Sequence, residues 1–153
     1  MLTWTRTSEG VVALRGEIDE KSVFDPLVHE LKDGGALDLS GVDRINSVGV
    51  RSWLTFVQAL DGNGKRVSLL ACSVPVVHQL NMISRFAGDA KVASIHAPFL
   101  CPECESSSTR LVDTTNADVD AQLSAGVACP KCGAAMEFDD VPASYFAFLR
   151  QRR

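Results

Sequence analysis

Hydrophobic residues between Ala36 and Leu60 fall into two periodic patterns. Residues 36–39 form a short apolar run bounded by glycine-containing turns at both ends, including Ser40-Gly41, which is typical of a buried strand. The apolar residues that follow recur at helical spacing and would share one face, namely Val50, Trp53, Leu54, Val57 and Leu60. Between the two segments, Asn46 or Ser47 can cap the helix by accepting hydrogen bonds from its first backbone N–H groups. The pattern predicts a strand that passes into a capped helix.

The segments on either side of this unit alternate between strand-like and helix-like patterns. The expected strands lie at residues 2–7, 11–18, 67–72 and 92–97, and further helices begin near residues 25–26 and 73–75. Ser8-Glu9-Gly10 suits the turn of a hairpin between the first two strands. Asp25 is expected to cap the first helix, with Pro26 in its first position. Because strands that alternate with helices usually pair in parallel, the expected fold class is α/β, a mixed sheet packed by helices.

Composition and charge disfavour some classes of function. Of the 153 residues, 46% are hydrophobic and 22% are charged, which suits a folded domain with a buried core. The formal net charge of −4 argues against binding a nucleic-acid backbone, because such binding requires clustered positive charge. No apolar run approaches the roughly 18 to 20 residues of a membrane span, and residues 1–10 lack the pattern of a secretory signal. We therefore expect a cytoplasmic protein without a membrane span.

Four of the five cysteines form two Cys-x-x-Cys pairs, Cys101-Pro-Glu-Cys104 and Cys129-Pro-Lys-Cys132. Four thiolates at this spacing can surround one Zn²⁺ tetrahedrally at about 2.3 Å per Zn–S bond, which leaves no open coordination position. The pattern resembles a zinc ribbon and predicts a structural Zn²⁺ site. Two disulfides are disfavoured in a reducing cytosol, and a redox pair is disfavoured because neither motif opens a helix after a strand.

The residues around these cysteines predict a small hairpin and a terminal helix. The expected ribbon strands are Thr109 to Val112, Val127-Ala128 and Met136 to Phe138, and the polar residues 113–124 are expected to form a mobile excursion. Residues 141–149 predict a short apolar helix that packs on the same chain. Cys72 ends a buried strand and is expected to be a small core residue.

The central strand and helix carry a specific motif, Asp38-Leu39-Ser40-Gly41-Val42 followed by Ile45-Asn46-Ser47-Val48-Gly49-Val50. With the preceding hairpin and short helix, this motif resembles the STAS fold of anti-sigma factor antagonists. In that family the sequence after the strand is usually Asp-Ser-Ser-Gly. A partner kinase, which is also the anti-sigma factor, phosphorylates one of these serines, and the phosphate blocks binding. Here Asn46 stands at the usual Asp and Val48 at the usual phosphorylated serine. Ser47 remains as a helix cap or a candidate phosphoacceptor.

The resemblance implies a bacterial signal-transduction protein that binds a regulatory partner such as a kinase or an anti-sigma factor. The residues expected to contact the partner or a ligand are Ser40, Asn46, Ser47, Val48 and Gly49. The expected domains are a STAS-like domain at residues 1–98, a zinc ribbon at 99–140 and a C-terminal helix and tail at 141–153. Exposed apolar elements also make a homodimer plausible.

Two alternatives to partner docking stay open. One is nucleic-acid binding through the zinc ribbon, and the other is a sensor of a nucleotide or small ligand at the helix start, where free N–H groups favour an anion. His29, His78 and His96 lie on three separate predicted elements, and no nucleophile elbow, phosphate loop or metalloprotease motif is present. We therefore expect a protein that is not an enzyme.

Overall fold

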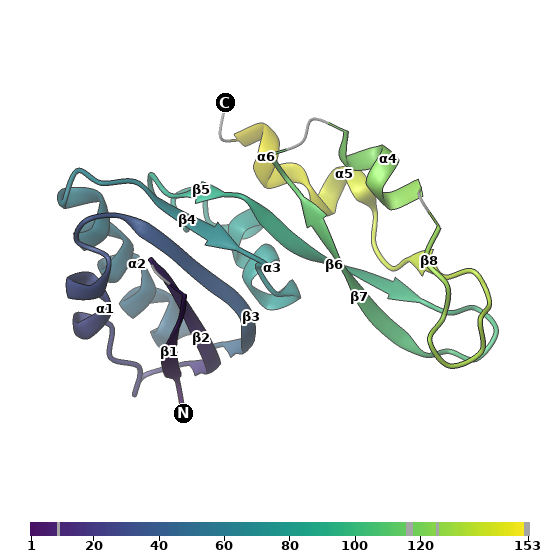
Figure 1. The fold of residues 1–153 in the computed structure, drawn as a ribbon, viewed down its shortest axis with the longest axis horizontal. Coiled ribbons are helices and arrows are strands. Elements are labelled where there is room, and N and C mark those ends of the chain that lie inside the picture. Colours follow the sequence, from purple (N-terminus) through teal and green to yellow (C-terminus); the bar gives the residue numbers. More distant parts are fainter. Residues whose placement is uncertain (9, 116–117, 125, 152–153) are drawn as a thin grey trace.

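The computed structural model describes residues 1–8, 10–115, 118–124 and 126–151 as a mixed α/β protein with two β-sheets (Figure 1). The first sheet contains β1 (Thr3–Ser8), β2 (Val11–Ile18), β3 (Gly35–Ile45), β4 (Val67–Leu70) and β5 (Lys91–Val92), in that spatial order. β1 is antiparallel to β2, and the other neighbours are parallel. The general prediction of an α/β fold with a mixed sheet is confirmed. Residue 9 of the expected hairpin turn lies outside the described residues.

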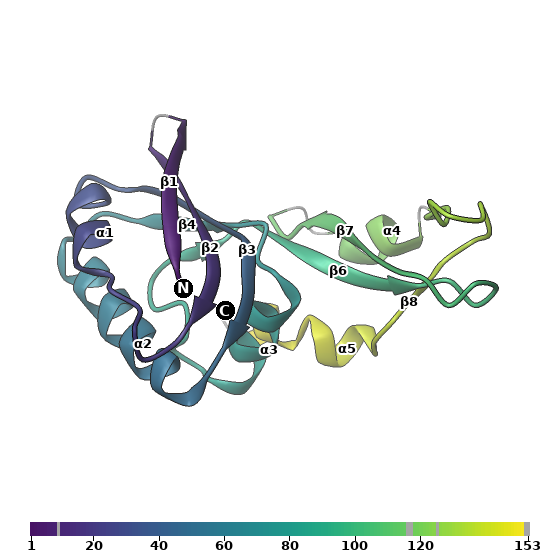
Figure 2. The ribbon, with the colours of Figure 1, turned by 90° about the horizontal axis from the view of Figure 1, so that it is seen from below.

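Three helices pack against the first sheet, namely α1 (Asp25–Glu30), α2 (Ser47–Gly62) and α3 (Val74–Met82). Figures 1 and 2 show α1 and α2 side by side over one face of the sheet. The predicted inner face of α2 is confirmed at Trp53, Val57 and Leu60, which are buried. Trp53 anchors this core, because its indole N–H donates to the Phe86 carbonyl oxygen (2.7 Å) and its ring stacks on that of Phe86. Phe56 is also buried, which makes the apolar face wider than predicted.

The start of α1 differs from the prediction. Phe24 occupies the N-cap position without a side-chain capping bond, and Asp25 is the first helical residue. The Phe24 ring is buried and stacks on Phe56 with 4.8 Å between ring centroids. Burial of this aromatic ring therefore positions the helix start, and the expected cap at Asp25 is wrong.

The chain passes from the first sheet to the second between Val92 and Ser94. The second sheet contains β6 (Ser94–Leu100) between β7 (Ser107–Asp113) and β8 (Glu137–Phe138). The Ala93 N–H donates to the Leu69 carbonyl oxygen (2.9 Å), whereas the Cys72 N–H donates to the Ser94 carbonyl oxygen (3.1 Å). The single strand expected at residues 92–97 is therefore wrong, because this stretch belongs to two sheets. The expected boundary after residue 98 falls within β6.

The segment that follows β7 is partly helical. α4 (Val119–Ser124) lies beside β7, and its Gln122 side chain bonds to both the N–H and the carbonyl oxygen of Asp113, each at 2.8 Å. Part of the segment expected to be a mobile excursion, residues 113–124, is therefore helical, which was not predicted. Its mobility stays a prediction. Residues 116–117 of that segment lie outside the described residues.

The C-terminal apolar segment forms two short helices, α5 (Pro142–Tyr145) and α6 (Ala147–Gln151), separated at Phe146. Tyr145 and Phe148 are each only 1% exposed. The Tyr145 hydroxyl donates to the His96 carbonyl oxygen on β6 (2.6 Å). The prediction that this segment packs on the same chain is confirmed, although a single helix was expected.

Candidate functional site

The two Cys-x-x-Cys motifs fold into turns with the same backbone pattern. In the first turn, the Cys101 N–H donates to Ser106 (2.8 Å) and the Cys101 carbonyl oxygen accepts from Glu105 (2.9 Å). In the second turn, the equivalent bonds join Cys129 to Ala134 (2.8 Å) and to Gly133 (2.9 Å). Glu105 (φ 63°) and Gly133 (φ 77°) also occupy the same left-handed conformation. The two motifs are therefore structurally equivalent knuckles.

The knuckles bring the four cysteine sulfurs together, all within 4.8 Å of one another. The Cys101–Cys132 and Cys104–Cys129 sulfur pairs are each 3.5 Å apart, and none of the four forms a disulfide. Four sulfurs around one tetrahedral Zn²⁺ would be separated by about 3.8 Å, given Zn–S bonds of about 2.3 Å. A metal ion can be held by cysteine, histidine or carboxylate side chains that lie close together. Among the described residues, these four cysteines form such a group.

Hydrogen bonds within the knuckles favour the thiolate form of Cys104 and Cys129, whereas the neighbouring sulfurs raise the pKa of Cys132. The hydroxyl and the backbone N–H of Ser106 lower the pKa of the Cys104 thiol to about 6. The backbone N–H groups of Cys132 and Lys131 lower the pKa of Cys129. Cys101 and Cys129 are buried, whereas Cys104 and Cys132 are exposed, so one side of the cluster faces solvent. The arrangement offers four sulfur ligands that could hold one metal ion.

The start of α2 is capped by Asn46 and not by Ser47. The Asn46 side-chain oxygen accepts from the Gly49 N–H (2.7 Å), and its amide donates to Glu20 (2.9 Å). Gly49 is buried against β2, where an added Cβ atom would lie 2.1 Å from the Ile18 carbonyl oxygen. Ser47 is the first helical residue and is exposed. Its expected capping role is therefore wrong, and its hydroxyl remains accessible.

Ser40 lies apart from the other predicted docking residues. Its hydroxyl donates to Asp38 (2.7 Å), and it sits inside β3, roughly 20 Å along the strand from Asn46 at about 3.3 Å per residue. The turn expected at Ser40-Gly41 is wrong. Gly41 pairs with Arg15 on β2, and an added Cβ would lie 2.7 Å from the Leu14 carbonyl oxygen. Gly41 therefore serves the close approach of two strands.

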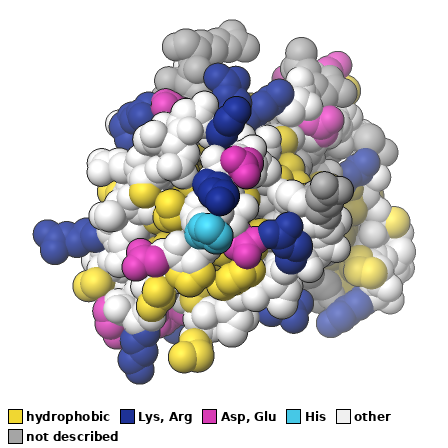
Figure 3. All heavy atoms as spheres, turned by 60° about the vertical axis from the view of Figure 1, so that its left-hand side comes forward, with side chains coloured by type: hydrophobic (Ala, Val, Ile, Leu, Met, Phe, Trp, Pro, Cys, Tyr) yellow, Lys and Arg dark blue, Asp and Glu magenta, His cyan; other side chains and the backbone are white. Residues whose placement is uncertain are grey.

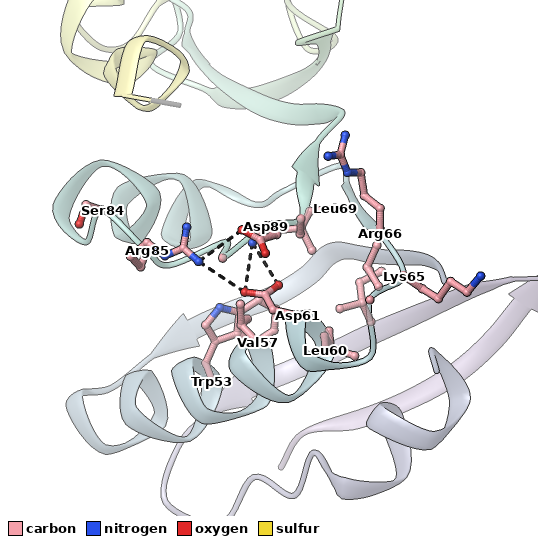
Figure 4. Close-up of a pocket in the computed structure, with 15 residues that line it drawn as sticks. Trp53, Val57, Leu60, Asp61, Lys65, Arg66, Leu69, Ser84, Arg85 and Asp89 are labelled. Atoms are coloured by element: carbon pink, nitrogen blue, oxygen red, sulfur yellow. Dashed lines mark hydrogen bonds and ion pairs between the residues drawn. The ribbon is translucent and has the colours of Figure 1, made fainter. Parts of the chain in front are cut away.

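A cleft of about 590 Å³ lies beside the C-terminal part of α2 and was not predicted (Figure 4). Its rim carries Asp61, Arg85 and Asp89. Arg85 is paired with both carboxylates (3.5 and 3.4 Å), and Asp61 accepts from the Asp89 N–H (3.1 Å). These charged groups satisfy one another, so the rim fastens the loop before β5 to α2. Arg85 and Asp89 lie in turns and not on a helix, and Asp61 is 24 positions before Arg85, so local spacing carries no signal for this contact.

Charged side chains on the side of the molecule that carries α1 and α2 have both signs interspersed (Figure 3). This face has no broad field of one sign, which a nucleic-acid backbone would require. None of the helices in the described ranges is long and apolar enough to cross a lipid bilayer.

Comparisons with known proteins identify no family. No protein-family model matches the chain, and no curated protein is significantly similar to it.

Proposed function

We propose that this protein is a non-enzymatic regulatory module that docks a protein partner at the N-terminus of α2, in a first domain of STAS-like type. The observation that supports this proposal best is the exposure of Val48, which stands in the first turn of α2 with 50% of its surface accessible. The Asn46 side chain already caps the helix by accepting from the Gly49 N–H, so Val48 has no part in capping. Val23, on the loop after β2, is also exposed (64%) at this end of the sheet. Exposed apolar side chains beside polar ones suit a protein contact.

The order of elements also supports a STAS-like first domain. A hairpin, a short helix and a strand precede α2, and the motif Asp38–Val42 and Ile45–Val50 lies on β3 and the start of α2. At the position where the family carries its phosphorylated serine, this chain has Val48, which cannot accept a phosphate. The accessible Ser47 is the candidate phosphoacceptor, and a phosphate there would lie at the positive end of the α2 dipole.

We also propose that the metal is Zn²⁺ and that its role is structural. A set of four sulfur donors without an open position suits Zn²⁺ and leaves no site for a substrate. The ion would hold together two knuckles that bury few apolar side chains. The zinc-bearing part would then stand beside the docking module as a zinc ribbon.

A charge substitution on the docking surface tests the function. Val48→Asp would place a carboxylate in the apolar contact, and Thr55→Asp is the matched control because Thr55 is exposed farther along α2. We expect a partner captured from cells of the source organism to bind the unmodified protein and Thr55→Asp but not Val48→Asp. Equal capture by all three proteins would contradict the proposal. Mass spectrometry of the protein isolated from those cells would establish whether Ser47 carries a phosphate.

A further inference from the structure

β1 is an edge strand whose outer side pairs with no strand of the described chain. In the five-stranded sheet it neighbours only β2, and Figures 1 and 2 show it at the outside of that sheet. Five of its six residues are exposed, and Trp4 is half-buried. An edge strand of this kind presents a row of unpaired N–H and carbonyl groups that can pair with another strand.

The sequence of β1 is complementary to itself. Around Thr5 the chain reads Thr-Trp-Thr-Arg-Thr, so an antiparallel copy centred on Thr5 would set Trp4 opposite Arg6 and Thr5 opposite Thr5. Cross-strand pairs of this kind stabilise antiparallel sheets, and a guanidinium over an indole ring adds a cation–π contact. Arg6 is paired with Glu30 of α1, so its charge is compensated and two copies of Arg6 need not repel.

Regular pairing with β2 holds the strand ready for such a contact. Thr3 to Arg6 pair in register with Arg15 to Val12, and the register shifts only after Arg6. At the edge of β7, by contrast, the Gln122 side chain bonds to both the N–H and the carbonyl oxygen of Asp113. No comparable side chain bonds to the β1 backbone among the described residues.

We propose that β1 pairs antiparallel with β1 of a second copy of this chain, around a two-fold axis at Thr5. The two five-stranded sheets would then form one continuous sheet across the dimer. A second copy suits this edge better than an unrelated strand because every side-chain pair across the axis is supplied by the chain itself. This contact is separate from the docking surface at Val48, so either proposal can fail without the other.

Introducing like charges at the two-fold axis tests the pairing. Thr5→Lys places two ammonium groups directly opposite each other, and Thr5→Glu places two carboxylates there, so each change opposes pairing. Thr5 is exposed, and Thr55→Lys makes the same change in charge on an exposed position of α2. Sedimentation velocity at low ionic strength, over a range of protein concentrations, measures the mass of each variant alone and of an equimolar Thr5→Lys and Thr5→Glu mixture.

We expect the unmodified protein and Thr55→Lys to rise with concentration from 16.5 kDa towards twice that mass. Each Thr5 variant alone should stay at the monomer mass, and the mixture should regain the dimer because Lys then faces Glu. Recovery in the mixture also shows that both variants are folded. A monomer at all concentrations, unchanged dimerisation of Thr5→Lys, or a mixture that stays monomeric would each overturn the proposal.

Discussion

The Asn81 side chain on α3 donates to the Tyr145 carbonyl oxygen (3.0 Å) and accepts from the Phe148 N–H (2.9 Å). These two backbone groups lie on either side of the break between α5 and α6, where helical hydrogen bonds are interrupted. One side chain from the first part of the chain therefore satisfies the broken C-terminal segment and fixes it against α3.

Removing this side chain should loosen the C-terminal helices. Asn81→Ala leaves a buried carbonyl and a buried N–H without partners, and each loss costs about 1–3 kcal/mol. We expect the free energy of unfolding in urea to fall by at least about 2 kcal/mol. Met82→Ala, at the neighbouring exposed position (73%), should change it by less than about 0.5 kcal/mol. Equal effects of the two substitutions would show that Asn81 does not hold α5 and α6.

Metal removal should act mainly on the knuckles. We expect about one Zn²⁺ per chain by elemental analysis, because four thiolates form one closed site. A chelator, or Cys104→Ser, should release the metal and raise hydrogen exchange around residues 101–106 and 129–136, while the strands of the first sheet stay protected. Cys72→Ala is the control and should retain the metal. Full metal content in Cys104→Ser would contradict the four-ligand site.

Burial of Cys72 should make stability depend on alkaline pH. Desolvation raises the pKa of its thiol from 9.0 to about 12, so the unfolded chain ionises at lower pH than the folded chain. The contribution of Cys72 is therefore complete below about pH 9 and is lost as the pH rises from about 9 to about 12. We expect the stability difference between the unmodified protein and Cys72→Ala, measured by urea unfolding of the metal-loaded forms, to change steadily over this range. A constant difference would contradict the buried neutral thiol.

Substitutions at the equivalent left-handed positions of the two knuckles should differ in their effect on the free energy of unfolding. Gly133→Ala puts a Cβ where φ is 77° and should lower the free energy of unfolding by about 1 kcal/mol. Glu105→Gly, at φ 63°, relieves the same strain and should not lower it. Thermal unfolding of the metal-loaded variants measures both effects. A loss in Glu105→Gly as large as that in Gly133→Ala would show that the Glu105 side chain stabilises its knuckle by other contacts.

Features that depend on neighbouring residues could be predicted from the sequence. The passage from β3 into α2 follows from apolar spacing and from the capping chemistry of Asn46, because both act within a few residues. The cysteine cluster follows from two short motifs, since each knuckle is a local turn that places two sulfurs together. The inner face of α2 likewise follows from the helical repeat.

Features that depend on distant partners required the folded chain. The division of residues 91–100 between two sheets arises from backbone bonds to β4 and β7, and an apolar run does not indicate which strand it will join. Gly41 resembles a turn residue in the sequence, yet it lies where β2 and β3 approach closely. The bonds from Asn81 to Tyr145 and Phe148 join residues that are 64 and 67 positions apart in the sequence. Local spacing specifies hydrogen bonds made within a turn or a cap, whereas contacts between remote segments form only when the whole chain packs.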